Sequence, residues 1–137
     1  PIGRLGRNSL GLILFTNDEK IHSKFTNSKR GVIRLFHIKL LTTLKLEHLK
    51  AIEKGFKHQG KLITVEAISY VEGSKENEIG IQIKNTGNSI LRTIFSHFKY
   101  DIETLDCVSI GPLTKKDLPR GNWKHLSELE ISQLMML

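Results

Sequence analysis

Side chains able to do chemistry are unevenly distributed, and the basic ones concentrate in the first 60 residues. This segment holds 12 of the 21 Lys and Arg residues of the chain but only 4 of its 14 Asp and Glu residues. The net charge of +7 therefore belongs mainly to one part of the chain. A one-sided basic surface favours binding to a polyanion through counterion release. The alternative is a surface that only keeps the domain in solution.

The residue types of common enzyme centres are present without the spacing that these centres need. The six histidines are scattered, and none is spaced like a set of metal ligands, so we expect no metal site. No glycine-rich loop precedes the Lys-Ser/Thr pair of a phosphate-binding loop. Cys107 is the only cysteine, which excludes an internal disulfide. Its place in an apolar strand pattern predicts a core residue rather than a nucleophile.

Length and composition predict one folded domain over residues 1–137. With 39% hydrophobic and 26% charged residues, the chain fits neither a disordered tail nor a membrane protein. The longest apolar run, residues 10–15, is too short to span a bilayer. We expect a monomer in a reducing, cytoplasmic compartment, with no membrane partner. Because the chain begins at Pro1, we interpret it as a piece of a longer protein.

The periodicity of apolar residues predicts interleaved strands and helices. Apolar runs and alternating patterns predict strands over residues 11–16, 32–40, 61–71, 79–83 and 101–110, with a turn at 73–74. Helical spacing predicts helices over residues 46–56 and 88–98, with Gly55 as a helix stop. Asn17 or Asp18 is expected to cap a short helix, and Ser127–Glu130 is a capping box that opens the last one. The order predicts an α+β fold: a mixed, largely antiparallel sheet flanked by helices.

Three segments resemble motifs of the RsuA/RluB branch of the ribosomal RNA pseudouridine synthases. Residues 3–18 read GRLGRNSLGLILFTND, where the family has G-R-L-D-x-x-T/S-x-G-L-L-L-x-T-N-D. Residues 34–36 read RLF where the family has K-x-Y, and residues 87–95 read GNSILRTIF. Residues 110–123 are similar to the closing segment of the family. The resemblance implies that residues 1–137 are the catalytic domain without its N-terminal part and without an S4-type RNA-binding domain.

The resemblance also implies a chemistry: isomerisation of uridine to pseudouridine in ribosomal RNA, without a metal or redox cofactor. An aspartate attacks an extruded uridine, an aromatic ring stacks on the base, and a basic residue holds the aspartate. Carried over, Phe36 is the stacking ring, Arg92 is the basic partner and Leu113 is an apolar wall. Gly6 stands at the nucleophile position. Because glycine has no side chain, we expect a catalytically impaired member of the family.

Other polar residues are expected to face the RNA. These are Arg4, Arg7, Asn8, Lys24, Lys29, Arg30, Arg34 and Asn88. The alternative for the loop cations is a solvated surface, for Phe36 a core position, and for Arg92 an exposed helix face. Asp18 is expected to cap a helix rather than replace the nucleophile. Trp123 is expected to pack in the core or in the wall of the pocket rather than to form a platform for a base. Two functions stay open: an RNA-modifying isomerase, or a non-catalytic RNA-binding or ribosome-associated domain.

Overall fold

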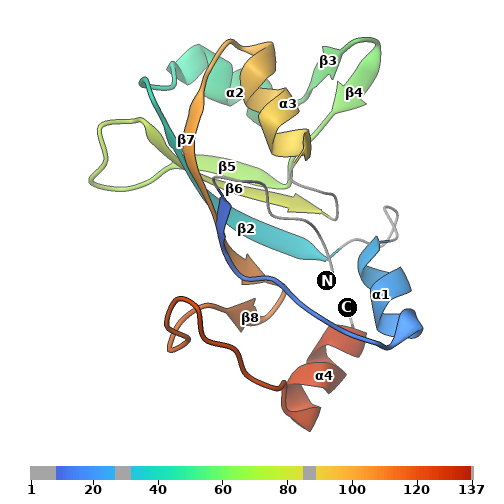
Figure 1. Cartoon of the computed structure of the whole chain (residues 1–137). Coiled ribbons are helices and arrows are strands. Elements are labelled where there is room, and N and C mark those ends of the chain that lie inside the picture. The colour runs from blue at the N-terminus through green and yellow to red at the C-terminus, as the bar shows by residue number, and fades with distance from the viewer. Residues whose placement is uncertain (1–8, 27–31, 85–88, 137) are drawn as a thin grey trace.

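A computed structural model describes residues 9–26, 32–84 and 89–136, which form a sheet with four helices around it (Figure 1). The strands follow the order β1-β7-β2-β6-β5, and β8 pairs with β7. Their bounds are Ser9–Gly11 (β1), Ile33–Leu40 (β2), Ala67–Tyr70 (β5), Glu78–Lys84 (β6), Ile102–Ile110 (β7) and Leu113–Thr114 (β8). Strand β1 runs parallel to β7, and the other pairs are antiparallel. The predicted fold class is confirmed.

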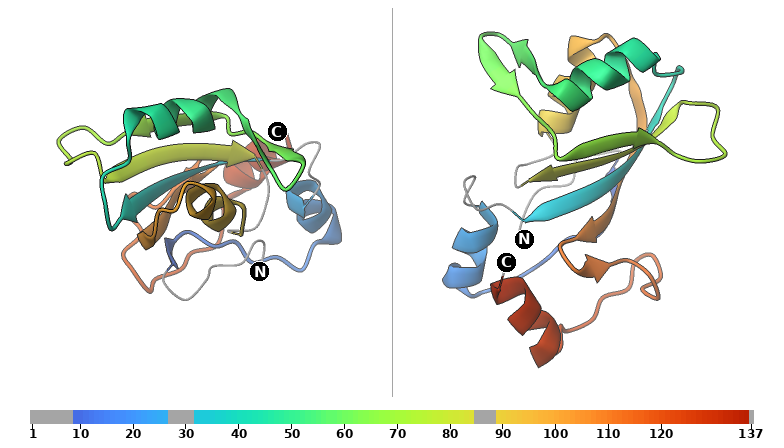
Figure 2. Two further views of the ribbon diagram at one scale, coloured as in Figure 1. Left: turned by 90° about the horizontal axis from the view of Figure 1, so that it is seen from above. Right: turned by 180° about the vertical axis from the view of Figure 1, so that it is seen from behind.

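Four helices begin and end close to the predicted positions. They are α1 (Glu19–Thr26), α2 (Leu46–Lys54), α3 (Ser89–His97) and α4 (Glu128–Met135). Asp18 caps α1, because its Oδ1 accepts a hydrogen bond of 2.9 Å from the backbone N–H of Lys20. Gly55 follows α2 with φ of 97°, and the Ser127–Glu130 capping box opens α4. Helices α2 and α3 lie at one end of the sheet, and α1 and α4 at the other (Figures 1 and 2).

The core lies on one face of the sheet, under α2 and α3. Every second residue of β2, from Arg34 to Leu40, is buried, as the alternating pattern predicted. Ile52 of α2 and Ile94 of α3 are fully buried and belong to the same apolar cluster. The opposite face of β2 carries partly exposed residues. The core therefore fixes the face on which Arg34 and Phe36 lie.

None of the described helices is long and apolar enough to cross a membrane.

Two predicted strands were wrong in extent. The strand expected over residues 11–16 is the three-residue β1, which ends at Gly11 because φ there is 97°. The strand expected over residues 61–71 is split into β4 (Lys61–Ile63) and β5. Strand β4 pairs with β3 (Phe56–His58), which the sequence pattern did not indicate, whereas β5 pairs with β6. The chain must turn between β4 and β5 because they belong to different sheets.

Candidate functional site

The structure describes only part of the predicted site. The side chains of Arg34, Phe36, Arg92 and Leu113 are described. Seven predicted residues lie outside the described residues: Arg4, Gly6, Arg7, Asn8, Lys29, Arg30 and Asn88. Lys24 belongs to α1, but its side chain also lies outside the described part. The geometry of the site can therefore be built around residues 34–36, the described parts of residues 3–18 and 87–95, and the closing segment 110–123.

Arg34 and Leu113 lie in one row across the buried face of the sheet. Arg34 of β2 is paired with Ile110 of β7, and Ile110 is paired with Leu113 of β8. Directly opposed residues of antiparallel strands share a face, so the three side chains are neighbours. Arg34 is 6% exposed and Leu113 is 8% exposed. The structure thus brings together a cation and an apolar wall residue from two of the matching segments.

Arg34 is the only buried charged residue among those that the structure describes. Burial lowers the pKa of its guanidinium, although the nearby Cys107 counteracts this in part. A guanidinium in an apolar row presents several donors in a fixed fork, a geometry suited to a carboxylate or a phosphate. Arg34 is therefore a buried cation at a position where the alternating pattern of β2 alone would place another aliphatic residue.

Phe36 lies two residues further along β2, on the same face, and is fully buried. It is paired with Ile81 on one side and Cys107 on the other. A ring without an exposed face cannot stack on a base in this conformation, so the prediction of an open stacking surface at Phe36 does not fit its burial. Its surroundings match the alternative, a core position on a strand.

Arg92, the predicted basic partner of the acid, lies on the exposed side of α3. Its neighbours Leu91 and Ile94 are fully buried, and residues on opposite sides of a helix cannot both face the core. The exposure of Arg92 fits the alternative, an exposed helix position. Its role as the basic partner stays a prediction, because position 6 lies outside the described residues.

The end of the first matching segment is held against β7. Ser9 is paired with Leu105 and Gly11 with Cys107, and the N–H of Leu12 donates a hydrogen bond of 3.0 Å to the carbonyl of Cys107. Because Cys107 is also paired with Phe36, the first and second segments meet on either side of this residue. Burial raises the pKa of the Cys107 thiol to about 11, which fits the predicted core role and not that of a nucleophile.

Two carboxylates near the first segment are engaged elsewhere. Asp18 caps α1, as predicted. Asp106 is paired with Leu10 in the sheet and accepts a hydrogen bond from the Lys115 ammonium. Its neighbours Leu105 and Cys107 are buried, so Asp106 lies on the face of β7 opposite to Phe36. Asp18 is thus held at the start of α1, and Asp106 lies on the opposite face of the sheet from Phe36 with one of its oxygens bound to Lys115.

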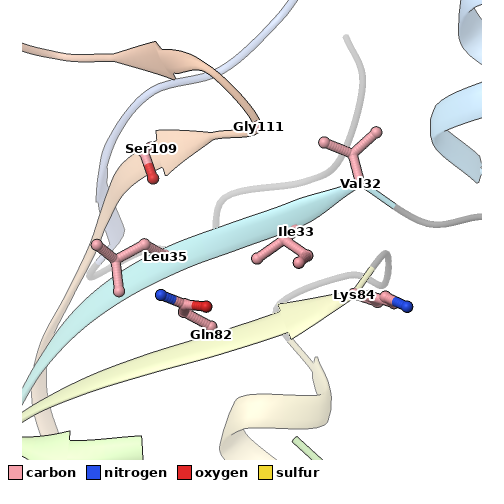
Figure 3. Close-up of a pocket in the computed structure, with 7 residues that line it drawn as sticks. All are labelled: Val32, Ile33, Leu35, Gln82, Lys84, Ser109 and Gly111. Atoms are coloured by element: carbon pink, nitrogen blue, oxygen red, sulfur yellow. The ribbon is translucent and has the colours of Figure 1, made fainter. Parts of the chain in front are cut away.

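A hollow of about 450 Å³ lies on the other face of the sheet (Figure 3). Its lining comes from β2, β6 and the end of β7: Val32, Ile33, Leu35, Gln82, Lys84, Ser109 and Gly111. Lys84, its one charged lining residue, lies 3.8 Å from Glu66. Among the described residues no group of three or more acidic, His or Cys side chains could hold a metal ion. Neither Arg34 nor Leu113 lines the hollow, and the same holds for the other predicted site residues whose side chains the structure describes, Phe36 and Arg92.

Comparison with known proteins gives the fold first. A crystal structure of a pseudouridylate synthase superposes with a TM-score of 0.82 over 97% of this chain and 58% of that chain, at 18% identity. This chain therefore has the fold of the matching part of a pseudouridylate synthase. No family model matches the sequence.

Relatives found by sequence similarity are pseudouridine synthases as well. Ribosomal large subunit pseudouridine synthase B of Vibrio cholerae is 25% identical over 99% of this chain and 43% of its own length. An uncharacterized RNA pseudouridine synthase of Aquifex aeolicus is 22% identical over 98% of this chain and 54% of its own length. Together with the fold, these relatives confirm the resemblance to the RsuA/RluB-type family of pseudouridine synthases. The chain spans about half the length of the curated relatives that it matches.

The exposed position of Trp123 differs from the prediction. Trp123 was expected in the core or the wall, but it is 76% exposed in the segment between β8 and α4. The signal was present: Pro119 and Gly121 break any regular element, and basic residues flank the ring on both sides. A tryptophan in a segment with so little apolar sequence has few partners with which to form a core.

Proposed function

We propose that this chain binds ribosomal RNA in the manner of a pseudouridine synthase and that its covalent catalysis is impaired. The observation that carries the proposal is the glycine at position 6, in a segment that otherwise follows the family motif almost residue for residue. Covalent attack needs an acidic side chain at that position. The engagement of Asp18 in a helix cap and of Asp106 with Lys115 supports the absence of a replacement acid.

The buried cation of β2 supports the binding half of the proposal. Arg34 places a guanidinium in a row whose other members, Ile110 and Leu113, are apolar, and a guanidinium can bind a phosphate through two donors at once. In the proposed complex an extruded uridine enters beside Arg34 and Leu113, and Arg34 binds an anionic group of the nucleotide. Phe36 forms the floor of this site and reaches the base only if the packing above its ring opens. The proposal places the protein in the cytoplasm as a monomer, with ribosomal RNA as its partner.

The test compares the wild-type protein with Gly6→Asp and Gly6→Asn, which differ in a single carboxylate. Each is incubated with unmodified ribosomal RNA transcribed in vitro, and pseudouridine is measured by carbodiimide tagging and mass spectrometry. We expect no detectable product from the wild type or Gly6→Asn. For Gly6→Asp we expect product at least about 100-fold above the detection limit, since this change alone restores the nucleophile. Binding of the same RNA is measured by filter retention for all three proteins.

Each outcome decides between an impaired pseudouridine synthase and the other candidates. Pseudouridine formed by the wild-type protein would overturn the proposal that catalysis is impaired. A Gly6→Asp protein that folds and binds RNA but stays inert would favour the second candidate, a non-catalytic RNA-binding or ribosome-associated domain. Absence of binding by all three proteins would refute both.

A further inference from the structure

The segment between β8 and α4 presents an aromatic ring to solvent. Trp123 is 76% exposed, although tryptophan is normally among the more buried residues of a folded domain. Its ring contacts that of His125 edge to face, with centroids 5.1 Å apart and an interplanar angle of 89°. One such contact covers at most one face of the indole, so the other face is open to a flat ligand.

Positive charge surrounds this ring. The segment from Lys115 to His125 contains four Lys and Arg residues and one acidic residue, Asp117. Two of the cations are engaged: Lys115 contacts Asp106, and the Lys124 ammonium lies 3.1 Å from Glu130. Lys116 and Arg120 are exposed and form no ion pair with a described residue. An open aromatic face between exposed cations is the combination that binds unpaired nucleotides, through stacking and phosphate contacts.

The backbone of the segment is shaped by turns rather than by a regular element. The N–H of Leu118 bonds to the carbonyl of Lys115, and that of Asn122 to the carbonyl of Pro119. The segment follows β8, which ends at Thr114 and also contains Leu113 of the Arg34 row (Figure 1). The chain thus connects the row and the segment that carries Trp123 through a single short strand.

We propose that Trp123 is a stacking platform for an unpaired base of single-stranded RNA next to the extruded uridine, with Lys116 and Arg120 binding the adjoining phosphates. This inference rests on the proposed RNA-binding function and adds a site outside the Arg34 row. Leu62 offers a comparison, because it is exposed but has no aromatic ring. It is 61% exposed on the β3–β4 hairpin, at the end of the molecule opposite to α4 (Figure 1).

Trp123 is the only tryptophan of the chain, so its fluorescence reports on this ring alone. The wild-type protein is titrated with a ten-nucleotide oligouridylate at fixed salt, and binding is followed in parallel by the anisotropy of an end-labelled oligonucleotide. Inorganic polyphosphate, which has charge but no bases, serves as the control ligand. We expect the oligouridylate to quench the fluorescence of Trp123 saturably, and the midpoint of this quenching to equal the midpoint of the anisotropy curve. Polyphosphate should not quench the fluorescence.

Substitutions of Trp123 and Leu62 distinguish stacking on an aromatic ring from the general effect of removing an exposed apolar side chain. Trp123→Ala is expected to weaken oligouridylate binding about 5- to 100-fold, whereas Trp123→Phe retains most of the affinity because it keeps a π-face. Leu62→Ala, the matched change of an exposed apolar residue, is expected to leave the affinity unchanged. Circular dichroism checks that all variants are folded.

Three results would overturn the inference. The first is RNA binding without quenching, and the second is wild-type affinity in Trp123→Ala; both leave the proposed RNA-binding function standing. The third is a blue shift of the emission that grows with protein concentration in the absence of RNA, because a second copy would then cover the ring. If oligouridylate does not bind at all while ribosomal RNA does, the platform is also refuted, since it predicts binding without a folded RNA context.

Discussion

Gly11 is the position at which a single methyl group should separate the first matching segment from the sheet. Its φ is 97°, a conformation that costs a residue with a Cβ about 1–3 kcal/mol. An added Cβ would also collide with the Cys107 carbonyl oxygen and lie 2.5 Å from the Cys107 nitrogen and 2.6 Å from Asp106 Oδ1. Backbone atoms of the central strand β7 cannot give way, so β1 must move.

The free-energy cost of Gly11→Ala is limited by the release of β1, since the strand can leave rather than remain strained. Release loses the pairing of three residues with β7, at a net cost of about 1 kcal/mol per hydrogen bond. We therefore expect Gly11→Ala to lower the free energy of unfolding by about 3 kcal/mol. Hydrogen exchange should accelerate at Leu12, whose N–H bonds to Cys107, while β2 and β6 stay protected.

Gly60→Ala is the matched control for this change. Gly60 also has a positive φ, of 78°, but nothing lies within 4 Å of the position of its Cβ. It should lose only about 1 kcal/mol from backbone strain, so the two variants differ by about 2 kcal/mol in urea unfolding. Equal losses in the two variants, or unchanged exchange at Leu12 in Gly11→Ala, would show that the close approach of β1 to β7 is wrong.

Two further predictions concern groups whose protonation the fold controls. The backbone N–H of Ser127 and the Lys124 ammonium hold the pKa of Glu130 below its usual value. The contribution of Glu130 to stability is therefore present at neutral pH and lost as the pH falls through its pKa in the folded protein. The difference in the free energy of unfolding between wild type and Glu130→Gln should vanish in acid. Ser127→Ala should lower the free energy of unfolding by about 1 kcal/mol at pH 7, measured by urea unfolding. Burial raises the pKa of Cys107 from 9.0 to about 11, so native protein at pH 8 should hold about 100-fold less thiolate than unfolded protein and react with iodoacetamide at least that much more slowly. The free energy of unfolding should decline above pH 9, because the unfolded chain loses this proton first. A native reaction rate close to the unfolded rate would contradict the burial of Cys107.

Periodicity predicted most of the fold because the elements that it identified bury one face. The alternation of β2 matches its burial residue by residue, and the apolar side of α3 packs against it. The wrong boundaries arose where backbone conformation, not hydrophobicity, decides. Apolar residues continue after Gly11, but its positive φ ends pairing there. Lys61–Ile63 alternates like the strand that follows, yet it pairs with β3, a partner that no local pattern reveals.

The site was harder to predict than the fold, since a motif fixes which residues align but not which of them solvent can reach. Phe36 matches the stacking ring and is fully buried, whereas Trp123 looked like a core residue and is exposed. In both cases the sequence reports an aromatic side chain, and its exposure depends on elements distant in sequence. For Phe36 these are β6 and β7, which flank it on both sides.

Arg34 connects the fold to the proposed function. The other buried side chains of β2 belong to the apolar cluster, and burial lowers the pKa of the Arg34 guanidinium. Under the proposed function, a phosphate of the RNA would add an anionic partner to this guanidinium, which has several donors in a fixed fork. The proposal therefore assigns two separate roles. Position 6, where glycine lacks a carboxylate, concerns covalent attack, and position 34 concerns contact with an anionic ligand, so a substitution at one position should leave the other role unchanged.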